Sequence, residues 1–117
     1  MPDRSGARQP AALDLLQGTL DVLILKTLVW GPTHGYGVSR WIRERTRDVL
    51  RVEDAALYQA LHRLERRRLI EAEWGVSENN RRAKYYSLTA EGRRALRAET
   101  DAWRQYARAV SRVLDPA

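Results

Sequence analysis

The chain has 117 residues, with 21 Lys and Arg against 15 Asp and Glu, no Cys, and hydrophobic residues at 44% of its positions. This length suits one domain, and the lack of Cys excludes disulfides and thiolate metal ligands. The longest stretch without a charged residue has 13 positions, residues 27–39, whereas a membrane-spanning helix needs at least about 18 apolar residues. We therefore expect no membrane partner, and we expect a cytoplasmic protein because no apolar run of signal-peptide length precedes Asp14.

No enzyme motif is recognisable in the sequence. The glycines of residues 31–37 match neither a P-loop nor a dinucleotide-binding fingerprint. The two histidines, His34 and His62, are 28 positions apart, with no Cys to complete a zinc motif. We predict no catalytic residues, no metal and no cofactor. The formal net charge of +6 points instead to nucleic acid, because clustered basic residues bind phosphates and release their counterions.

The first part of the chain reads as a polar arm followed by two helices. Residues 1–12 are polar and without periodicity, which is typical of a flexible N-terminal arm. A Leu-rich stretch over residues 13–30 predicts the first helix, which Gly31 and Pro32 end. A second helix is predicted from about residue 33 or 34 to residue 46.

A third helix follows a short connector. Asp54 is a good N-cap residue, and the helical pattern ends near Arg67. The apolar residues of this segment form a narrow stripe made of Leu57, Ala60, Leu61 and Leu64.

The period of the pattern then changes. Residues 70–76 alternate strictly between apolar and polar, as in a half-buried strand, and residues 84–88 are rich in strand formers. The basic, turn-like segment 77–83 joins them, so we predict a β-hairpin. Thr89 is the expected N-cap of a fourth helix, which continues to about Leu114.

Three helices and a hairpin with a basic tip form the order of a winged helix-turn-helix, whose third helix enters the DNA major groove. We therefore predict a mainly α fold with a small β-hairpin, made of a DNA-binding domain over residues 13–89 and a dimerisation helix over 90–114. A helix of 25 residues is about 37 Å long, which exceeds the width of so small a domain. Heptad spacing along it indicates a seam for a second copy. We assign to the dimer interface Leu16, Leu20, Leu96, Thr100, Trp103, Ala107, Val110 and Leu114.

Several short motifs also occur in a fixed order. They are G-T-L-D at 18–21, G-P at 31–32, H-G-Y at 34–36, L-Y at 57–58, A-L-H-R-L-E at 60–65, E-W-G at 73–75, S-E-N-N-R at 77–81, K-Y-Y at 84–86, L-T at 88–89, and Gly92. With these motifs the chain resembles the PadR family of bacterial transcriptional regulators over residues 16–114. In particular, it resembles the short type with a single C-terminal helix, described as acidobacterial PadR-like. The resemblance implies a dimeric winged-helix DNA binder, usually a repressor that leaves its operator when a small molecule binds.

The third helix departs from the family pattern. Ala55 and Ala56 stand where Gly-Ser or Gly-Thr is usual, Gln59 stands where Pro is usual, and Arg68 stands where Gly usually ends the helix. An amide at Gln59 is able to pair with adenine in the major groove, which Pro is not. These departures leave the fold prediction unchanged and bear on the operator sequence.

The outer face of the third helix and the basic end of the hairpin are the predicted DNA-binding elements. At 100° per residue, Gln59 and Arg66 face away from the apolar stripe, while Tyr58 lies beside it and suits a phosphate contact. The alternatives are a merely solvated helix surface and a hairpin edge kept soluble by charge. The predicted DNA-binding residues are Ala55, Ala56, Tyr58, Gln59, His62, Arg63, Arg66, Asn80, Arg81, Arg82 and Lys84.

Trp103 is a candidate ligand-binding residue. It lies in the middle of the seam, beside the small residues Thr100 and Ala107. Two symmetry-related indoles would frame a slot for a small planar aromatic effector, or they would simply fill the interface. The resemblance supports the slot, since some short PadR-like regulators bind flat compounds between tryptophans of this helix.

The sequence thus predicts a homodimeric repressor that binds a double-stranded DNA operator and has no catalytic activity. The alternative is an adaptor with the same fold that binds other proteins and does not touch DNA. The adaptor would show no salt-dependent affinity for DNA.

Overall fold

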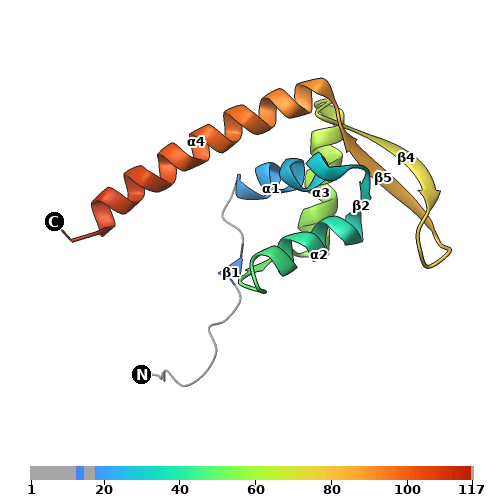
Figure 1. Cartoon of the computed structure of the whole chain (residues 1–117), viewed down its shortest axis with the longest axis horizontal. Coiled ribbons are helices and arrows are strands. Elements are labelled where there is room, and N and C mark those ends of the chain that lie inside the picture. Colours follow the sequence, from blue (N-terminus) through green and yellow to red (C-terminus); the bar gives the residue numbers. More distant parts are fainter. Residues whose placement is uncertain (1–12, 15–17, 117) are drawn as a thin grey trace, which may run out of the picture.

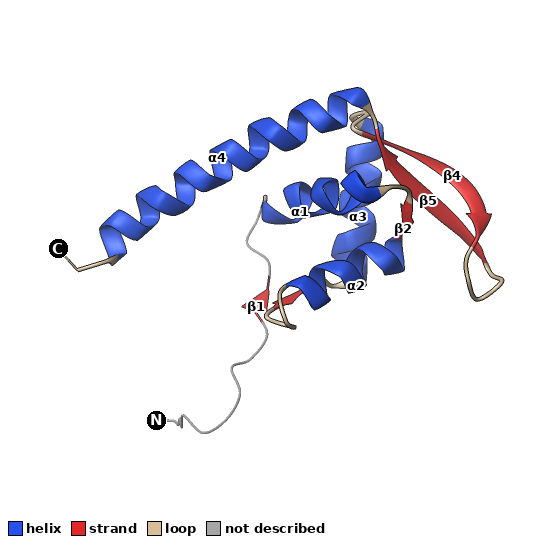
Figure 2. Cartoon of the chain, in the orientation of Figure 1, coloured by secondary structure: helices blue, strands red, loops and turns tan. Residues whose placement is uncertain are grey.

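The computed structural model describes residues 13–14 and 18–116 (Figure 1). Its mainly helical architecture with a small antiparallel sheet confirms the predicted fold class (Figure 2). The predicted arm, residues 1–12, and Leu16 of the predicted dimer interface lie outside the described residues. The elements in chain order are β1 (Leu13–Asp14), α1 (Thr19–Thr27), the 3-10 helix η1 (Leu28–Trp30), β2 (Thr33–His34), α2 (Gly35–Arg45), β3 (Leu50–Arg51), α3 (Asp54–Arg66), β4 (Ile70–Val76), β5 (Arg82–Leu88) and α4 (Ala90–Leu114).

Helix α1 begins later than the Leu-rich pattern predicts. The residue before it, Gly18, has a φ of 88°, a left-handed conformation that cannot occur inside a right-handed helix. At the other end the chain tightens into η1, and Gly31 with a φ of 134° ends the helical stretch. The predicted helix over residues 13–30 is therefore correct only from Thr19 onward.

Residues Thr33 and His34 form a strand rather than the start of a helix. They pair antiparallel with Tyr86 and Tyr85 of β5, so the sheet has three strands in the order β2-β5-β4. Helix α2 accordingly begins at Gly35, and the His34 ring caps it, because Nδ1 accepts a hydrogen bond from the Gly37 N–H at 3.0 Å. This pairing joins segments about fifty residues apart, and local periodicity carries no sign of it.

Helix α3 has the predicted range, with a correction at its start. The N-cap residue is Glu53, which makes no capping hydrogen bond through its side chain, and Asp54 is the first helical residue. A carboxylate in the first turn still interacts favourably with the positive end of the helix dipole. After the C-cap residue Arg67, Arg68 has a φ of 62°. This left-handed conformation is the physical reason for expecting Gly at that position.

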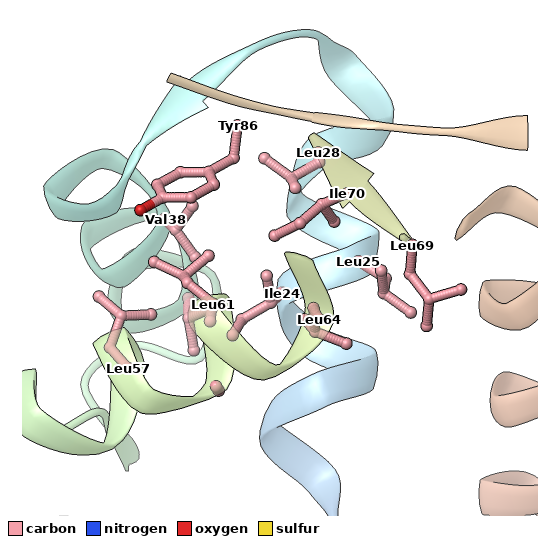
Figure 3. Packing of buried hydrophobic residues seen from close by; sticks show 12 residues of the cluster. Ile24, Leu25, Leu28, Val38, Leu57, Leu61, Leu64, Leu69, Ile70 and Tyr86 are labelled. Carbon is pink, nitrogen blue, oxygen red and sulfur yellow. The ribbon is translucent and has the colours of Figure 1, made fainter. Parts of the chain in front are cut away.

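The core lies between the three short helices and the sheet (Figure 3). The predicted stripe of α3 is confirmed, since Leu57, Ala60, Leu61 and Leu64 are at most 1% exposed. Each fully buried Leu or Ile contributes about 1.5–3 kcal/mol relative to an exposed one. The other core residues are Ile24, Leu25, Leu28, Val38, Ile42, Leu69, Ile70 and Tyr86.

Helix α4 starts at the domain and then leaves it. The predicted cap is confirmed, because Thr89 Oγ1 accepts a hydrogen bond from the Gly92 N–H at 2.9 Å and its hydroxyl donates to the Arg68 carbonyl at 2.8 Å. A Cβ at Gly92 would collide with the Leu69 carbonyl oxygen, so the first turn packs tightly against the turn between α3 and β4. The helix then passes α1 and extends away from the other elements (Figure 1). Within the part of the chain that the structure describes, no helix has the length and apolar character needed to cross a membrane.

Candidate nucleic-acid interface

The outer face of α3 is open to solvent. Its buried stripe turns toward the core, and a helix that buries one side must present the other. Tyr58, at one flank, has 51% of its surface exposed. All seven residues predicted for DNA binding on this helix are exposed: Ala55, Ala56, Tyr58, Gln59, His62, Arg63 and Arg66.

Arg63 differs from the others because its side chain already has a partner. Its Nη2 lies 2.6 Å from Asp21 Oδ1 on α1, a charge-assisted hydrogen bond between residues 42 positions apart. The Asp21 side chain is only 15% exposed, whereas that of Arg63 is 49% exposed. The pair therefore ties the exposed side of α3 to α1.

The hairpin of β4 and β5, residues 70–88, forms the wing. Its turn is closed by hydrogen bonds from the Ser77 N–H to the Arg81 carbonyl at 2.8 Å and from the Asn80 N–H to the Ser77 carbonyl at 2.9 Å. Asn80, with a φ of 59°, takes the left-handed position that Asn tolerates better than most residues. Asn80, Arg81 and Arg82 are exposed, so the tip presents two guanidinium groups.

Lys84 is held against the domain. Its Nζ lies 3.4 Å from Glu65 Oε1 on α3 and 5.8 Å from the centre of the Tyr86 ring. Both side chains of the ion pair are about one-third exposed. The pair links the wing to α3 and neutralises part of the charge predicted for DNA binding.

A groove of about 690 Å³ runs between the wing on one side and α2 and α3 on the other. We call it the wing groove. It brings together four of the residues predicted for DNA binding, Tyr58 of α3 and Arg81, Arg82 and Lys84 of the hairpin. It also includes Tyr36, Arg40 and Trp74, which were not predicted for the site from the sequence. Their signal in the sequence is weak, since a Tyr and an Arg four residues apart are ordinary on the polar side of a helix.

One carboxylate, Glu78, is present among the residues that line the wing groove. Its pKa is held below the usual range, first by a hydrogen bond from backbone N–H of its own residue and then by the His34 side chain. His34 Nε2 lies 3.5 Å from Glu78 Oε1, which connects the wing turn to the start of α2. Because Arg40, Arg81, Arg82 and Lys84 also line it, the groove is positively charged overall.

The predicted dimer seam divides into a covered part and an exposed part. Leu20, Leu96 and Thr100 are half-buried where α4 passes α1, and Ala107 is half-buried further along. Trp103 is 47% exposed and Leu114 is 76% exposed. The free end of α4 thus carries an uncovered apolar surface, which also includes Tyr106, Val110 and Val113.

Trp103 borders two grooves between α1 and α4. The one on the side of Asp21 and Glu99 has a volume of about 560 Å³ and also contacts Tyr106. The other, of about 620 Å³, is lined on one side by Leu23 and Leu96. The first groove combines two carboxylates with two aromatic rings, a composition that suits an aromatic cation.

No cluster of three or more His, Asp or Glu side chains able to hold a metal ion occurs in residues 13–14 and 18–116. The wing groove offers guanidinium groups, an ammonium group, hydroxyls and aromatic faces. These groups recognise phosphate and sugar through hydrogen bonds and charge.

The chain is similar to known transcriptional regulators. The model of the Transcriptional regulator PadR-like family matches residues 24–98. In sequence, the chain is 32% identical over 90 residues to an uncharacterized protein of Lysinibacillus sphaericus, which covers 77% of this chain and 83% of that protein.

Solved structures show the same similarity. A transcriptional regulator from Clostridium thermocellum has a TM-score of 0.74 and 29% identity, with 82% of this chain and 90% of that chain covered. A PadR family transcription regulator from Clostridium difficile has a TM-score of 0.71 and 30% identity, with 83% of this chain and 99% of that chain covered. The likeness therefore extends over nearly the whole length of both solved chains.

Proposed function

Because this chain belongs to the PadR-like family of transcriptional regulators, rather than to a family of enzymes, we propose that it is a homodimeric, ligand-responsive repressor that binds a two-fold operator. The observation that carries the proposal is that Tyr58, from the exposed side of α3, lines one positively charged groove together with Arg81 and Arg82 of the wing. A helix that fits the major groove, next to a hairpin that reaches the flanking backbone, is the arrangement of winged-helix DNA binders.

In this proposal α3 supplies sequence recognition. Gln59 and Arg66 lie on its exposed side, and neither has a salt bridge or hydrogen-bond partner among the side chains that the structure describes. A Gln amide pairs with adenine, and an Arg guanidinium pairs with guanine, through two hydrogen bonds each. Arg81 and Arg82 of the wing supply sequence-independent contacts to phosphate.

Dimerisation follows from the uncovered end of α4. Val110 is 36% exposed and Val113 is 83% exposed, on a helix that has left its own domain. Contiguous exposed apolar side chains of this kind favour association. A second copy offers the same surface, so two α4 helices would cover each other around a two-fold axis.

The effector site we propose is the groove that contains Trp103, Asp21 and Glu99. Since Trp103 also lies in the proposed seam, an effector there would change how the two α4 helices cross. Such a change would alter the spacing of the two α3 helices and weaken binding to paired half-sites.

The test is a gel-shift and anisotropy titration of the intact protein with the DNA directly upstream of its own coding region. We expect specific binding that weakens as salt rises, and loss of binding when Arg81 and Arg82 are both replaced by Glu. The control is the same double charge change at Arg108 and Arg112 of α4, which lie outside the α3 face and the wing. An adaptor that binds other proteins would show no salt-dependent DNA affinity in any of these forms.

A further inference from the structure

His34 lies where β2, α2 and the wing meet. It is the last residue of β2, where it pairs with Tyr85 of β5, and it is also the N-cap residue of α2. Its side chain is only 18% exposed, and its Nε2 lies 3.5 Å from Glu78 Oε1 in the wing turn. Two motifs that are far apart in the chain, H-G-Y and S-E-N-N-R, therefore meet at this ring.

Two tyrosine rings and one hydrogen bond fix the orientation of the imidazole. The Tyr85 ring meets it edge to face with the ring centres 5.3 Å apart, and the Tyr36 ring stacks on it at 6.4 Å. Aromatic rings at these separations attract each other. Because Nδ1 also accepts the hydrogen bond from the Gly37 N–H at 3.0 Å, the ring is held in one orientation with Nε2 facing the wing turn.

The hydrogen bond with Gly37 determines which ring nitrogen carries the proton. A nitrogen that accepts a hydrogen bond has no hydrogen of its own, so the imidazole is neutral and its proton is on Nε2. The Nε2–H then faces the Glu78 carboxylate, whose negative charge favours this tautomer over the other. The cap of α2 and the contact with the wing thus depend on the same proton.

Tyr85 provides a second contact between His34 and the wing. Its ring lies over Gly75 of β4, where an added Cβ would come within 3.1 Å of the ring, and its hydroxyl donates a hydrogen bond to the Val76 carbonyl at 3.2 Å. A separation of 3.5 Å is long for a hydrogen bond, so the contact between His34 and Glu78 is weak by itself. The two contacts together connect the start of α2 to both strands of the wing.

The wing turn is followed by the two arginines proposed to contact DNA independently of sequence. Arg81 and Arg82 are exposed and come directly after the turn that contains Glu78. Two ion pairs join the wing to the rest of the described chain, and that of Glu78 is nearer to the tip than that of Lys84 with Glu65. An exposed hairpin tip with few outside contacts moves readily, so the contact at Glu78 restricts the arginines most directly.

We infer that His34 is a positioning residue: as a neutral imidazole with its proton on Nε2, it holds the wing turn toward α2 and so sets the location of Arg81 and Arg82. This role rests on the proposed function, because the location of the two arginines matters only if the wing contacts DNA. His34 acts through the wing turn and not by contacting DNA itself.

The first experiment detects the state of the ring. The chain has two histidines, so a long-range ¹H–¹⁵N spectrum of the free protein at about pH 8, where histidines are ordinarily neutral, shows both rings, and His62→Gln identifies them. We expect His34 to be the Nε2–H tautomer. His62, exposed on α3, is the control and should show the averaged signal of two exchanging tautomers. An Nδ1–H tautomer or an averaged signal for His34 would overturn the inference.

The second experiment separates capping from positioning with His34→Asn. Asn is a good N-cap residue, but its side chain is too short to reach Glu78. We expect a melting temperature close to that of the unmodified protein, together with lower NMR order parameters for residues 77–82. Glu78→Ala should lower the same order parameters without touching the cap, so the test does not depend on the folding of the His34 variant.

The third experiment measures DNA binding with a matched charge control. Glu78→Ala and Glu73→Ala each remove one carboxylate from the wing, but Glu73 is exposed and has no ion pair among the described side chains. On a random-sequence duplex of about 30 bp, Glu78→Ala should bind about threefold more weakly than Glu73→Ala. Glu78→Gln, which keeps an acceptor for the Nε2–H, should bind like Glu73→Ala. Adding His34→Asn to Glu78→Ala should cause no further loss.

The outcomes distinguish the inference from the proposed function. If the unmodified protein binds no duplex, the proposed function fails, and the role of His34 in DNA binding fails with it. If the protein binds duplex and Glu78→Ala binds as well as Glu73→Ala, only the positioning role is overturned. Order parameters that stay unchanged in both His34→Asn and Glu78→Ala would also overturn it.

Discussion

The guanidinium of Arg63 is joined to the carboxylate of Asp21 by a 2.6 Å hydrogen bond, so the exposed side of α3 is fixed to α1. Asp21 also lines the groove that contains Trp103 of α4. One carboxylate therefore contacts the helix proposed to read DNA and borders the site proposed for the effector. A substitution of Asp21 should therefore change both the position of α3 and the surroundings of Trp103.

The first prediction concerns how Arg63 acts on DNA. If Arg63 positions α3, both Arg63→Ala and Asp21→Ala should weaken operator binding, because either change releases α3 from α1. If Arg63 reads a base directly, Asp21→Ala should instead strengthen binding by freeing the guanidinium. We expect the first result, with a loss of about 1 kcal/mol in the free energy of unfolding for each variant. Chemical denaturation and anisotropy titration of both single variants and the double variant measure these effects.

The double variant supplies the control for this prediction. When two residues form one interaction, their effects are not additive, so the double variant should lose little more stability than either single variant. Fully additive losses would show that Arg63 and Asp21 act independently, contrary to the contact between them.

The second prediction is that sequence recognition and general affinity for DNA are separable. Gln59→Ala should cost about 1–3 kcal/mol on the operator and relax the preference for it, because a base contact is lost. Arg82→Ala should weaken binding to all duplexes alike and reduce the salt slope by about one. Titrations against the operator and a scrambled duplex at several salt concentrations distinguish the two patterns. If neither change affects operator binding, the proposed docking of α3 and the wing is wrong.

The third prediction concerns backbone strain after α3. Arg68 has a φ of 62°, where a side chain costs energy that Gly does not pay. Arg68→Gly should therefore raise the free energy of unfolding by about 0.5–1 kcal/mol, which corresponds to a few degrees in melting temperature. The matched control is Arg67→Gly, since Arg67 has a φ of −80° and Gly there should lower stability. A drop in stability with Arg68→Gly would contradict the strained conformation.

Local signals account for the parts of the fold that were predicted correctly. The stripe of Leu57, Leu61 and Leu64, the alternation over residues 70–76, and the Thr89 cap each involve neighbours along the chain, so they appear in the sequence itself. The pairing of Thr33 with Tyr86 and the bond between Arg63 and Asp21 join distant residues. No periodicity reports such contacts, because they arise only when the elements pack.

The same distinction applies to the site. The exposure of Gln59 and Arg66 follows from the helical period of α3. The location of Tyr36 and Arg40 in the wing groove does not follow from the period of any one helix, because it depends on where α2 lies relative to the wing. The role of Lys84 likewise changes once Glu65 is known to lie 3.4 Å away. Residues on one element were thus predictable, and residues brought together by different elements were not.

The fourth prediction is that the exposed end of α4 holds a dimer. Val110→Glu should shift the protein toward monomer, since it places a charge in the proposed seam, while Arg108→Glu on the opposite side of the helix should leave the dimer unchanged. Light scattering at micromolar concentration measures the mass of each form. In the dimer, the two α3 helices should engage half-sites about 10 bp apart, and operator cleavage footprints report this spacing.

A truncation tests the other role of α4. Removing the chain after Gly92 deletes Ala95 and Leu96, which pack against the core beside α1. The shortened protein should be poorly soluble or unfolded, as judged by circular dichroism. A stable, folded truncated protein, or a monomer mass for the intact one, would contradict the proposed part that α4 plays.

The fifth prediction concerns an effector at Trp103. The groove beside it contains Glu99 and Tyr106, so a planar aromatic cation would gain both stacking and charge neutralisation there, whereas the Asp21 carboxylate is already paired with Arg63. Binding should quench Trp103 fluorescence and lower operator affinity over the same concentration range. Trp103→Ala should abolish both effects while leaving a dimer, and a planar phenol of similar size measures the contribution of charge.

The fluorescence assay has to isolate Trp103 from the other indoles. Trp30 is 69% exposed and Trp74 is 57% exposed, so both would respond to ligand in solution, and Trp41 also emits. A variant in which these three residues are Phe leaves Trp103 as the only indole, and its operator binding is checked first because Trp74 borders the wing groove. Glu99→Gln should reduce the affinity for the cation more than the affinity for the phenol, because only the cation interacts with the carboxylate charge. Quenching that persists in Trp103→Ala, with the other three tryptophans intact, would locate the ligand elsewhere. That result would contradict the proposal that the effector changes how the two α4 helices cross.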